Sequence, residues 1–198
     1  MDKKDVLADV AVLSVAGLVL AGVYFSLSPG LKKIAKALHG PRPQIVAAGT
    51  PADYDWTIES LDGQKRKVSD FKGKVIFLNF WATWCGPCRM EMPSIQALQE
   101  KFKDRDVVFL LVSNEKPSEL SAFVEKKKWT LPVYAAAESP AFYNVTGIPT
   151  TYILSRDGRV ALSEDGAKDW NRKPTVELLE TLLQPATTQR STAGTKAG

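Results

Sequence analysis

The sequence predicts one α/β domain, because short apolar runs typical of buried strands alternate with helical patterns. The first apolar run, Val75 to Leu78, follows Gly73 and is predicted to be a buried strand. A second buried strand is predicted over Val107 to Val112. Between the two strands lies a helical pattern, whose apolar side chains recur on one face at Cys88, Met92, Ile95, Leu98 and Phe102. At 198 residues, the chain has room for one domain of ordinary size and short appendages.

Two cysteines stand where the first strand is expected to turn into the helix. Cys85 lies close to the first free backbone N–H groups, and these donors, with the positive end of the helix dipole, favour a thiolate. Cys88 is three residues further on and shares a helix face with Cys85. Pro87 suits the first helical turn, where an N–H has no helical partner, and its fixed φ stiffens the loop. The pattern predicts a dithiol that opens and closes a disulfide.

Three other uses of these cysteines are weaker. A structural disulfide would close almost no loop, because the chain's only two cysteines lie three positions apart. A zinc site needs more ligands, and the one histidine, His39, is far along the chain from the pair. Haem attachment would need a histidine after Cys88, where the sequence has Arg89. No metal or cofactor is therefore expected.

The residues around the cysteines resemble a known active site. The run Trp84-Cys85-Gly86-Pro87-Cys88 is similar to the active site of the thioredoxin superfamily. The wider run from Leu78 to Cys85, with Glu91 and Pro93, resembles the membrane-anchored TlpA/ResA-like branch, whose domain is of the redoxin or AhpC/TSA type. This resemblance implies a thioredoxin fold with an N-terminal β-hairpin and a central strand–helix insertion, preceded by one transmembrane helix.

The remaining elements before the end of the insertion can be assigned in order. Asp55 to Leu61 and Gln64 to Val68 are predicted to pair across an Asp-Gly turn, and they resemble the hairpin of that branch. A helix is predicted over Pro117 to Lys128. Leu131 to Tyr134 and Pro140 to Val145 fit the strand and the helix of the family's insertion.

The last part of the domain is predicted to contain two more strands and a final helix. Thr150 to Leu154 and Arg159 to Leu162 are predicted to be antiparallel strands joined by a Ser-Arg-Asp-Gly turn. A helix over Thr175 to Leu183 presents one apolar stripe and closes the domain, which is expected to span residues 53–184. Residues 185–198 are polar and rich in small side chains, and they are expected to be disordered.

A second part of the active site is implied by the resemblance. Gly147-Ile148-Pro149-Thr150 resembles the thioredoxin loop in which a cis peptide bond precedes a proline that faces the dithiol. Its expected role is to leave the Ile148 backbone free to pair with an extended substrate. An ordinary strand-start proline is the alternative. The residues expected to bind substrate are Trp84, Gly86, Pro87, Ile148 and Pro149.

One position departs from the generic thioredoxin pattern. Asn79 stands where that family has a buried, proton-handling Asp six residues before the first cysteine, and an amide cannot titrate. Glu91 matches a carboxylate of the TlpA/ResA-like branch, so it is expected to tune the thiol pKa and to accept a proton from Cys88. A solvent-facing Glu near the positive helix end is the alternative.

Trp81 and Trp84 are either core or an apolar rim around the site, and Trp84 is the better candidate for the rim.

The N-terminal region contains the predicted membrane anchor. Residues 10–31 carry no charge and would span about 33 Å as a helix, enough for a bilayer. Residues 1–9 are then a cytoplasmic segment, and residues 32–52, with several prolines, a linker. A cleaved signal peptide is the main alternative. The positive-inside rule would place the domain in the cytoplasm, whereas the resemblance places it on the periplasmic side of a bacterial inner membrane.

Charge gives no indication of a nucleic-acid partner. The formal net charge is +4, but the first 42 residues hold six basic and three acidic residues. From Pro43 onward, 20 basic residues face 19 acidic ones, so the domain is nearly neutral.

The favoured function is therefore an extracytoplasmic thiol–disulfide oxidoreductase that reduces protein disulfides. The resemblance implies disulfide-containing protein substrates, a membrane electron donor and, within the family, a place in cytochrome c maturation. One alternative is a peroxiredoxin-type peroxidase, in which Thr83 would take the place of that family's threonine. Another is a redox-inert binding module on the same scaffold, although the intact dithiol argues against it.

The anchor can be tested directly. We expect the full-length protein to sediment with membranes, to resist extraction by carbonate and to keep its own N-terminus, because residues 10–31 are long and apolar enough to remain in the bilayer. Cell fractionation with N-terminal sequencing makes the measurement. A soluble form that begins beyond Ser28 would indicate a cleaved signal peptide instead.

Overall fold

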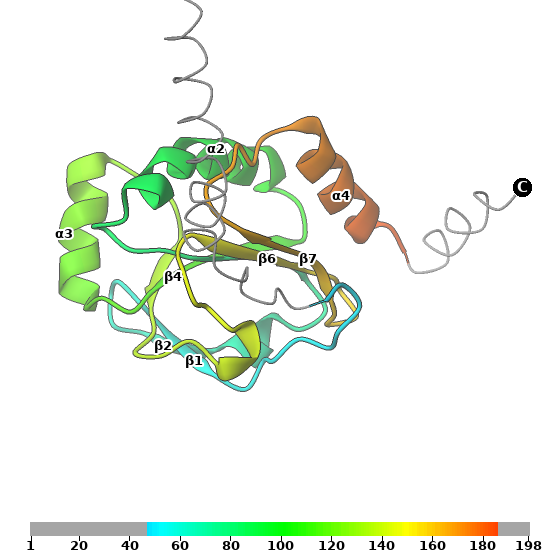
Figure 1. Cartoon of the computed structure of the whole chain (residues 1–198), viewed down its shortest axis with the longest axis horizontal. Helices are drawn as coiled ribbons and strands as arrows, with labels where there is room; N and C mark the ends of the chain where they lie inside the picture. Colours follow the sequence, from blue (N-terminus) through cyan, green and yellow to red (C-terminus); the bar gives the residue numbers. More distant parts are fainter. Residues whose placement is uncertain (1–46, 186–198) are drawn as a thin grey trace, which may run out of the picture. The chain divides into compact units, whose positions relative to one another are not determined.

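The computed structural model describes residues 47–185 (Figure 1). Its seven strands are β1 (Thr57–Ser60), β2 (Lys65–Lys67), β3 (Val75–Phe80), β4 (Val107–Ser113), β5 (Val133–Ala135), β6 (Thr150–Leu154) and β7 (Val160–Asp165). The helices are α2 (Gly86–Phe102), α3 (Pro117–Lys127) and α4 (Lys173–Leu183), with two 3₁₀ turns, η1 (Val68–Phe71) and η2 (Ala141–Tyr143).

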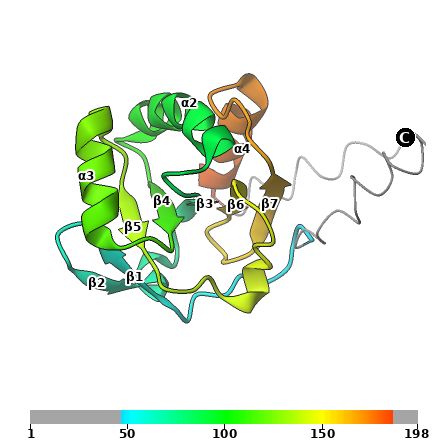
Figure 2. The ribbon, with the colours of Figure 1, turned by 60° about the vertical axis from the view of Figure 1, so that its left-hand side comes forward.

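All seven strands form one mixed sheet in the order β2-β1-β5-β4-β3-β6-β7, which Figure 2 shows from one edge to the other. The pairs of β4 with β3 and with β5 are parallel, and the other pairs are antiparallel. With the flanking helices this is the predicted α/β thioredoxin-like fold. The N-terminal hairpin and the inserted strand are also present, and they meet because β1 pairs with β5.

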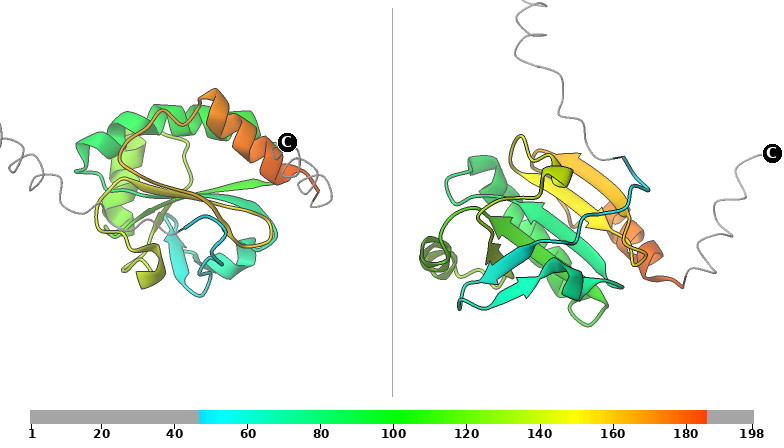
Figure 3. Two further views of the ribbon diagram at one scale, coloured as in Figure 1. Left: turned by 45° about the vertical axis from the view of Figure 1, so that its right-hand side comes forward. Right: turned by 90° about the horizontal axis from the view of Figure 1, so that it is seen from below.

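The two faces of the sheet are covered differently. Side chains of α2, α3 and α4 belong to one core cluster, and Figure 3 shows α2 and α4 together on one side of the sheet. The opposite cluster draws its side chains from η1, η2 and the segment before β1. Strand β3 lies between β4 and β6, and all six of its residues are buried. Burial on both faces explains why β3 is continuously apolar up to Asn79.

Most elements lie where the sequence predicts them, and the differences have local reasons. The strand expected from Leu131 begins at Val133, since Pro132 has no N–H to donate to a neighbouring strand. The helix expected over 140–145 is only the single turn η2, and the residue that follows it, Asn144, is in a left-handed conformation with φ of 42°. The last strand continues beyond Leu162 to Asp165, where its register reaches Thr150.

Within residues 47–185, none of the helices is both long and apolar enough to cross a membrane. The predicted anchor at 10–31, the segment at 1–9 and the tail from residue 186 lie outside the described residues. So does the linker up to residue 46.

Two methionines on α2 test how the helix packs. Met92 is completely buried in the core, whereas Met90, two residues earlier, is 73% exposed. We expect Met92→Ala to lower the free energy of unfolding by about 2–5 kcal/mol, since it removes buried side-chain volume. Met90→Ala deletes the same atoms from the surface and should change it by less than about 0.5 kcal/mol. Denaturant unfolding of both variants makes the comparison, and equal losses would contradict this packing.

Candidate active site

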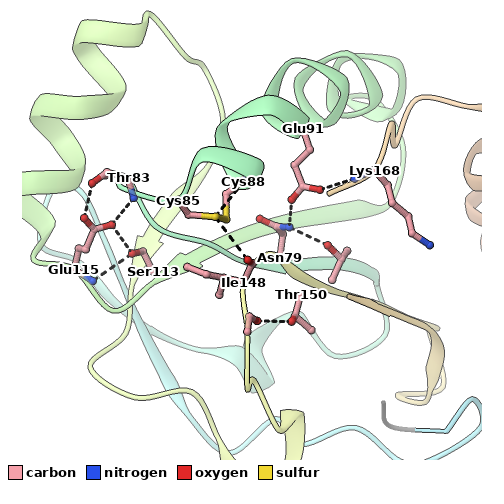
Figure 4. The surroundings of a disulfide bond; sticks show 12 residues. Asn79, Thr83, Cys85, Cys88, Glu91, Ser113, Glu115, Ile148, Thr150 and Lys168 are labelled. Carbon is pink, nitrogen blue, oxygen red and sulfur yellow. Dashed lines mark hydrogen bonds between the residues drawn. A yellow bond between two sulfur atoms is a disulfide. The ribbon is translucent and has the colours of Figure 1, made fainter. Parts of the chain in front are cut away.

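The two cysteines form a disulfide at the start of α2 (Figure 4). Cys85 is the N-cap residue, and its sulfur accepts the backbone N–H of Cys88 at 3.1 Å. Such a donor favours a thiolate on Cys85 in the reduced protein. Cys85 keeps 4% of its surface exposed, and Cys88 keeps none. Cys85 is therefore the sulfur on the outer side of the pair.

The second expected part of the site lies against this disulfide. The peptide bond between Ile148 and Pro149 is cis. The Ile148 carbonyl oxygen lies 3.7 Å from Cys85 Sγ, within reach of a thiol hydrogen bond in the reduced state. No hydrogen bond in the described part of the chain uses the Ile148 N–H. An extended peptide could therefore pair with the Ile148 backbone beside Cys85.

A groove of about 560 Å³ opens next to the disulfide. Trp84 lines it and is 71% exposed, so it belongs to the rim of the site. Trp81 touches the groove but is 2% exposed and belongs mainly to the core. Ile148 also lines the groove, whereas Gly86 and Pro87 lie in the first turn of α2, outside its lining.

Glu91 is buried, with 2% of its surface exposed, so the solvent-facing alternative is wrong. One carboxylate oxygen accepts the side-chain amide of Asn79 at 2.8 Å. The other accepts the indole N–H of Trp170 at 2.9 Å and the backbone N–H of Lys168 at 3.1 Å. Burial raises the pKa of the Glu91 carboxyl above its usual value, although the three hydrogen bonds act in the opposite direction. Glu91 is thus a carboxyl group held in a fixed position, three residues after Cys88.

Asn79 connects this carboxylate to the sheet. The same amide nitrogen that bonds Glu91 also donates to Thr151 Oγ1 at 2.9 Å. The amide in the position of the generic thioredoxin Asp therefore serves as a donor to a carboxylate on the neighbouring helix.

Several contributors to the site do not follow from the sequence reasoning. Trp170 and Lys168 come from the loop after β7, and Thr151 comes from β6. The one signal in the sequence that could have indicated them is a large apolar side chain, Trp170, within a polar loop. The structure shows that this side chain is buried, with 2% of its surface exposed. On the other side of the disulfide, Glu115 binds Thr83 through both oxygens, and no pattern in the sequence indicates it. Within the described residues, acidic, cysteine and histidine side chains form no cluster suited to a metal ion.

Comparisons with known proteins agree with this geometry. The AhpC/TSA family model matches residues 49–163. The chain is 41% identical over 108 residues to the thioredoxin-like protein YneN of Bacillus subtilis, a match that covers 52% of this chain and 64% of that relative's length. It is 34% identical over 136 residues to the thiol-disulfide oxidoreductase ResA of Bacillus cereus, covering 67% of this chain and 75% of ResA.

A solved structure has the same fold. It is that of a candidate thiol:disulfide interchange protein DsbE from Chlorobium tepidum, with a TM-score of 0.62 and 28% sequence identity. The similarity covers 70% of this chain and 99% of that one.

The exposure of the two sulfurs predicts their order of reaction. After reduction, iodoacetamide at pH 7 should label Cys85 first, because Cys85 is the outer sulfur and accepts the Cys88 N–H. Mass spectrometry of briefly treated protein measures the site of labelling. In a Cys85→Ser control, Cys88 should react slowly. Preferential labelling of Cys88 in the wild type would reverse the two roles.

Burial of Glu91 predicts a pH-dependent contribution to stability. Because its pKa is higher in the folded protein than the ordinary 4.5, the unfolded chain releases this proton at lower pH. The contribution of Glu91 is therefore full below pH about 4.5 and is lost as pH rises through the folded pKa. Glu91→Gln should remove this decline, as measured by urea unfolding across a pH series. The exposed Glu100→Gln is the control and should keep the decline, and a decline that persists in Glu91→Gln would assign it to another group.

Proposed function

The chain belongs to the AhpC/TSA family, in its TlpA/ResA-like thioredoxin branch, and is a thiol–disulfide oxidoreductase; we propose that it reduces protein disulfides outside the cytoplasm. The observation that carries the proposal is the position of the Cys85–Cys88 disulfide. It lies at the start of α2, with Cys85 Sγ 3.7 Å from the Ile148 carbonyl oxygen and beside an open groove. A disulfide of an extended polypeptide could reach Cys85 there.

The reaction proceeds in two exchanges. The Cys85 thiolate attacks one sulfur of the substrate disulfide, forms a mixed disulfide and releases the other substrate sulfur as a thiol. Cys88 then loses its proton and attacks Cys85 Sγ, which releases the second substrate thiol and forms the Cys85–Cys88 disulfide. The substrate gains two electrons, and its two leaving thiolates take up the two protons of the dithiol: the Cys85 proton from solvent, which received it when the thiolate formed, and the Cys88 proton from the group that accepted it. We assign Glu91 the acceptance of the Cys88 proton, because it is the buried carboxyl one turn along α2.

Two features favour a reductant. Gly86-Pro87 lacks a histidine that could stabilise the Cys85 thiolate, and strong oxidants depend on such stabilisation. A negative charge on Glu91 would also disfavour a nearby thiolate. A less stable thiolate makes the dithiol a better electron donor. Outside the cytoplasm it would need a membrane thiol–disulfide partner to reduce it again.

We place the protein in a bacterial inner membrane, anchored by residues 10–31, with its domain on the periplasmic side. The resemblance to the membrane-anchored branch supports this location, and apocytochrome c is the substrate that we would test first.

The two alternative functions are less well supported. In a peroxiredoxin-type peroxidase, Thr83 would act beside the reactive cysteine, but its hydroxyl donates to Glu115 Oε1 at 2.5 Å. A redox-inert binding module would not need a closed disulfide beside a groove.

The direction of electron flow predicts the redox potential. We expect a potential more negative than about −200 mV, closer to thioredoxin at about −270 mV than to strong oxidants at about −120 mV. Equilibration of the purified protein with glutathione buffers, followed by thiol alkylation, measures it. If the protein is fully reduced in a glutathione buffer poised at about −150 mV, it is an oxidant, and the proposal of a reductant is wrong.

The substrates can be identified through the intermediate. A Cys88→Ser variant cannot complete the second exchange, so it should accumulate mixed disulfides through Cys85. A Cys85→Ser/Cys88→Ser control should capture none. Comparable capture by both variants would mean that the adducts do not arise from the proposed reaction.

A further inference from the structure

The loop between β3 and α2 carries both the groove rim and the reactive sulfur. It contains only residues 81–85, and Trp84 and Cys85 are its last two members. Its first residue is held by a hydrogen bond from the Trp81 N–H to the Val112 carbonyl oxygen at 3.0 Å. The centre of the loop is held by a side chain from another element, Glu115.

Glu115 binds Thr83 through both of its carboxylate oxygens. Oε2 accepts the Thr83 backbone N–H at 2.7 Å, and Oε1 accepts the Thr83 hydroxyl at 2.5 Å. The Ser113 hydroxyl at the end of β4 also donates to Oε2, at 3.0 Å. A carboxylate accepts such bonds more strongly than a neutral group does. Within the described residues Glu115 forms no ion pair, and its carboxylate hydrogen bonds run to Thr83 in the loop and to Ser113 at the end of β4.

This connection lies along one wall of the groove. Trp84, Ser113 and Asn114 line the groove. Ser113 is one of the two residues that Glu115 joins, and Trp84 directly follows the other, Thr83. Figure 4 shows Glu115 and Thr83 on the side of the disulfide away from Glu91. Glu115 is therefore placed to fix the groove wall, whereas Glu91 is placed on the side of the resolving sulfur.

We propose that Glu115 is a positioning residue for polypeptide substrates: by holding Thr83, it keeps Trp84 and Cys85 at the spacing from Ile148 that an extended disulfide-containing peptide requires. The proposal rests on the proposed function as a disulfide reductant. A peptide that pairs with Ile148 must also contact Trp84, so its binding depends on both walls. A small disulfide needs only access to Cys85 Sγ and depends little on the wall.

The test compares two disulfide substrates with the reduced full-length protein, solubilised where necessary. We expect Glu115→Ala to lower kcat/KM for insulin reduction by about tenfold, mainly through KM, because the wall is no longer fixed. The rate with hydroxyethyl disulfide should change by less than about twofold. Glu115→Gln should retain most of the insulin activity, since its amide oxygen can accept the Thr83 N–H and its NH₂ can donate to the Thr83 hydroxyl.

Two further variants separate positioning from folding. Thr83→Val removes the hydroxyl but keeps the side-chain shape. It should lower kcat/KM for insulin reduction, as Glu115→Ala does, but by a smaller factor. Thr83→Ser should restore the activity. The control is Glu119→Ala, an exposed carboxylate in the first turn of α3 that accepts the Lys116 N–H, and it should leave both rates unchanged.

Each outcome decides the proposal. Unchanged insulin kinetics in both Glu115→Ala and Thr83→Val would overturn it. Equal losses with insulin and hydroxyethyl disulfide would place Glu115 in the chemistry or stability of the dithiol, and would also overturn it. If Glu115→Gln loses as much insulin activity as Glu115→Ala, the negative charge of Glu115 matters and not its hydrogen bonds to Thr83, and the positioning role is overturned. A wild-type protein that reduces neither substrate would instead refute the proposed function.

Discussion

A buried carboxylate must be hydrogen-bonded, and in this protein that requirement ties the active site to the rest of the fold. Leaving Glu91 unpaired would cost far more than a typical hydrogen bond contributes. Its three donors come from β3 and from the loop after β7, and Asn79 extends the network to Thr151 on β6. Helix α2, which begins at the disulfide, is thereby fixed against the central strands and the C-terminal part of the domain.

The dithiol is held on its other side by a second carboxylate of a different kind. Glu115 is only half-buried, and its partners are Thr83, in the loop after β3, and Ser113, at the end of β4. Because these two strands are parallel neighbours, their carboxyl ends meet at one edge of the sheet. The buried carboxylate thus lies on α2, three residues after Cys88, and the half-buried one holds the loop that carries Trp84 and Cys85.

The sequence is informative wherever the signal is local. The strand, turn and helix around Cys85, and the face that carries Cys88, follow from apolar spacing and helix-end chemistry within about 30 residues. The partners of Glu91 do not follow, because Lys168 and Trp170 are 77 and 79 positions away and only the topology brings them together. Glu115 is missed for a related reason, since a glutamate after a strand carries no signature until its partner is known. The sequence favours Trp84 over Trp81 for the rim of the site, and the structure agrees, because Trp84 is exposed and Trp81 is buried.

The inserted segment between α3 and β6 forms much of the groove beside the Cys85–Cys88 disulfide. Its strand, β5, pairs with both β4 and β1, so it joins the N-terminal hairpin to the central sheet. The residues that follow β5, from Ala136 to Ser139, line the groove beside the disulfide, and so do Val145 and Thr146 before the cis peptide bond. The disulfide and Glu91 lie elsewhere, at the start and in the first turns of α2. Much of the groove wall beside the disulfide, including the exposed carboxylate of Glu138, therefore comes from a segment separate from β3 and α2.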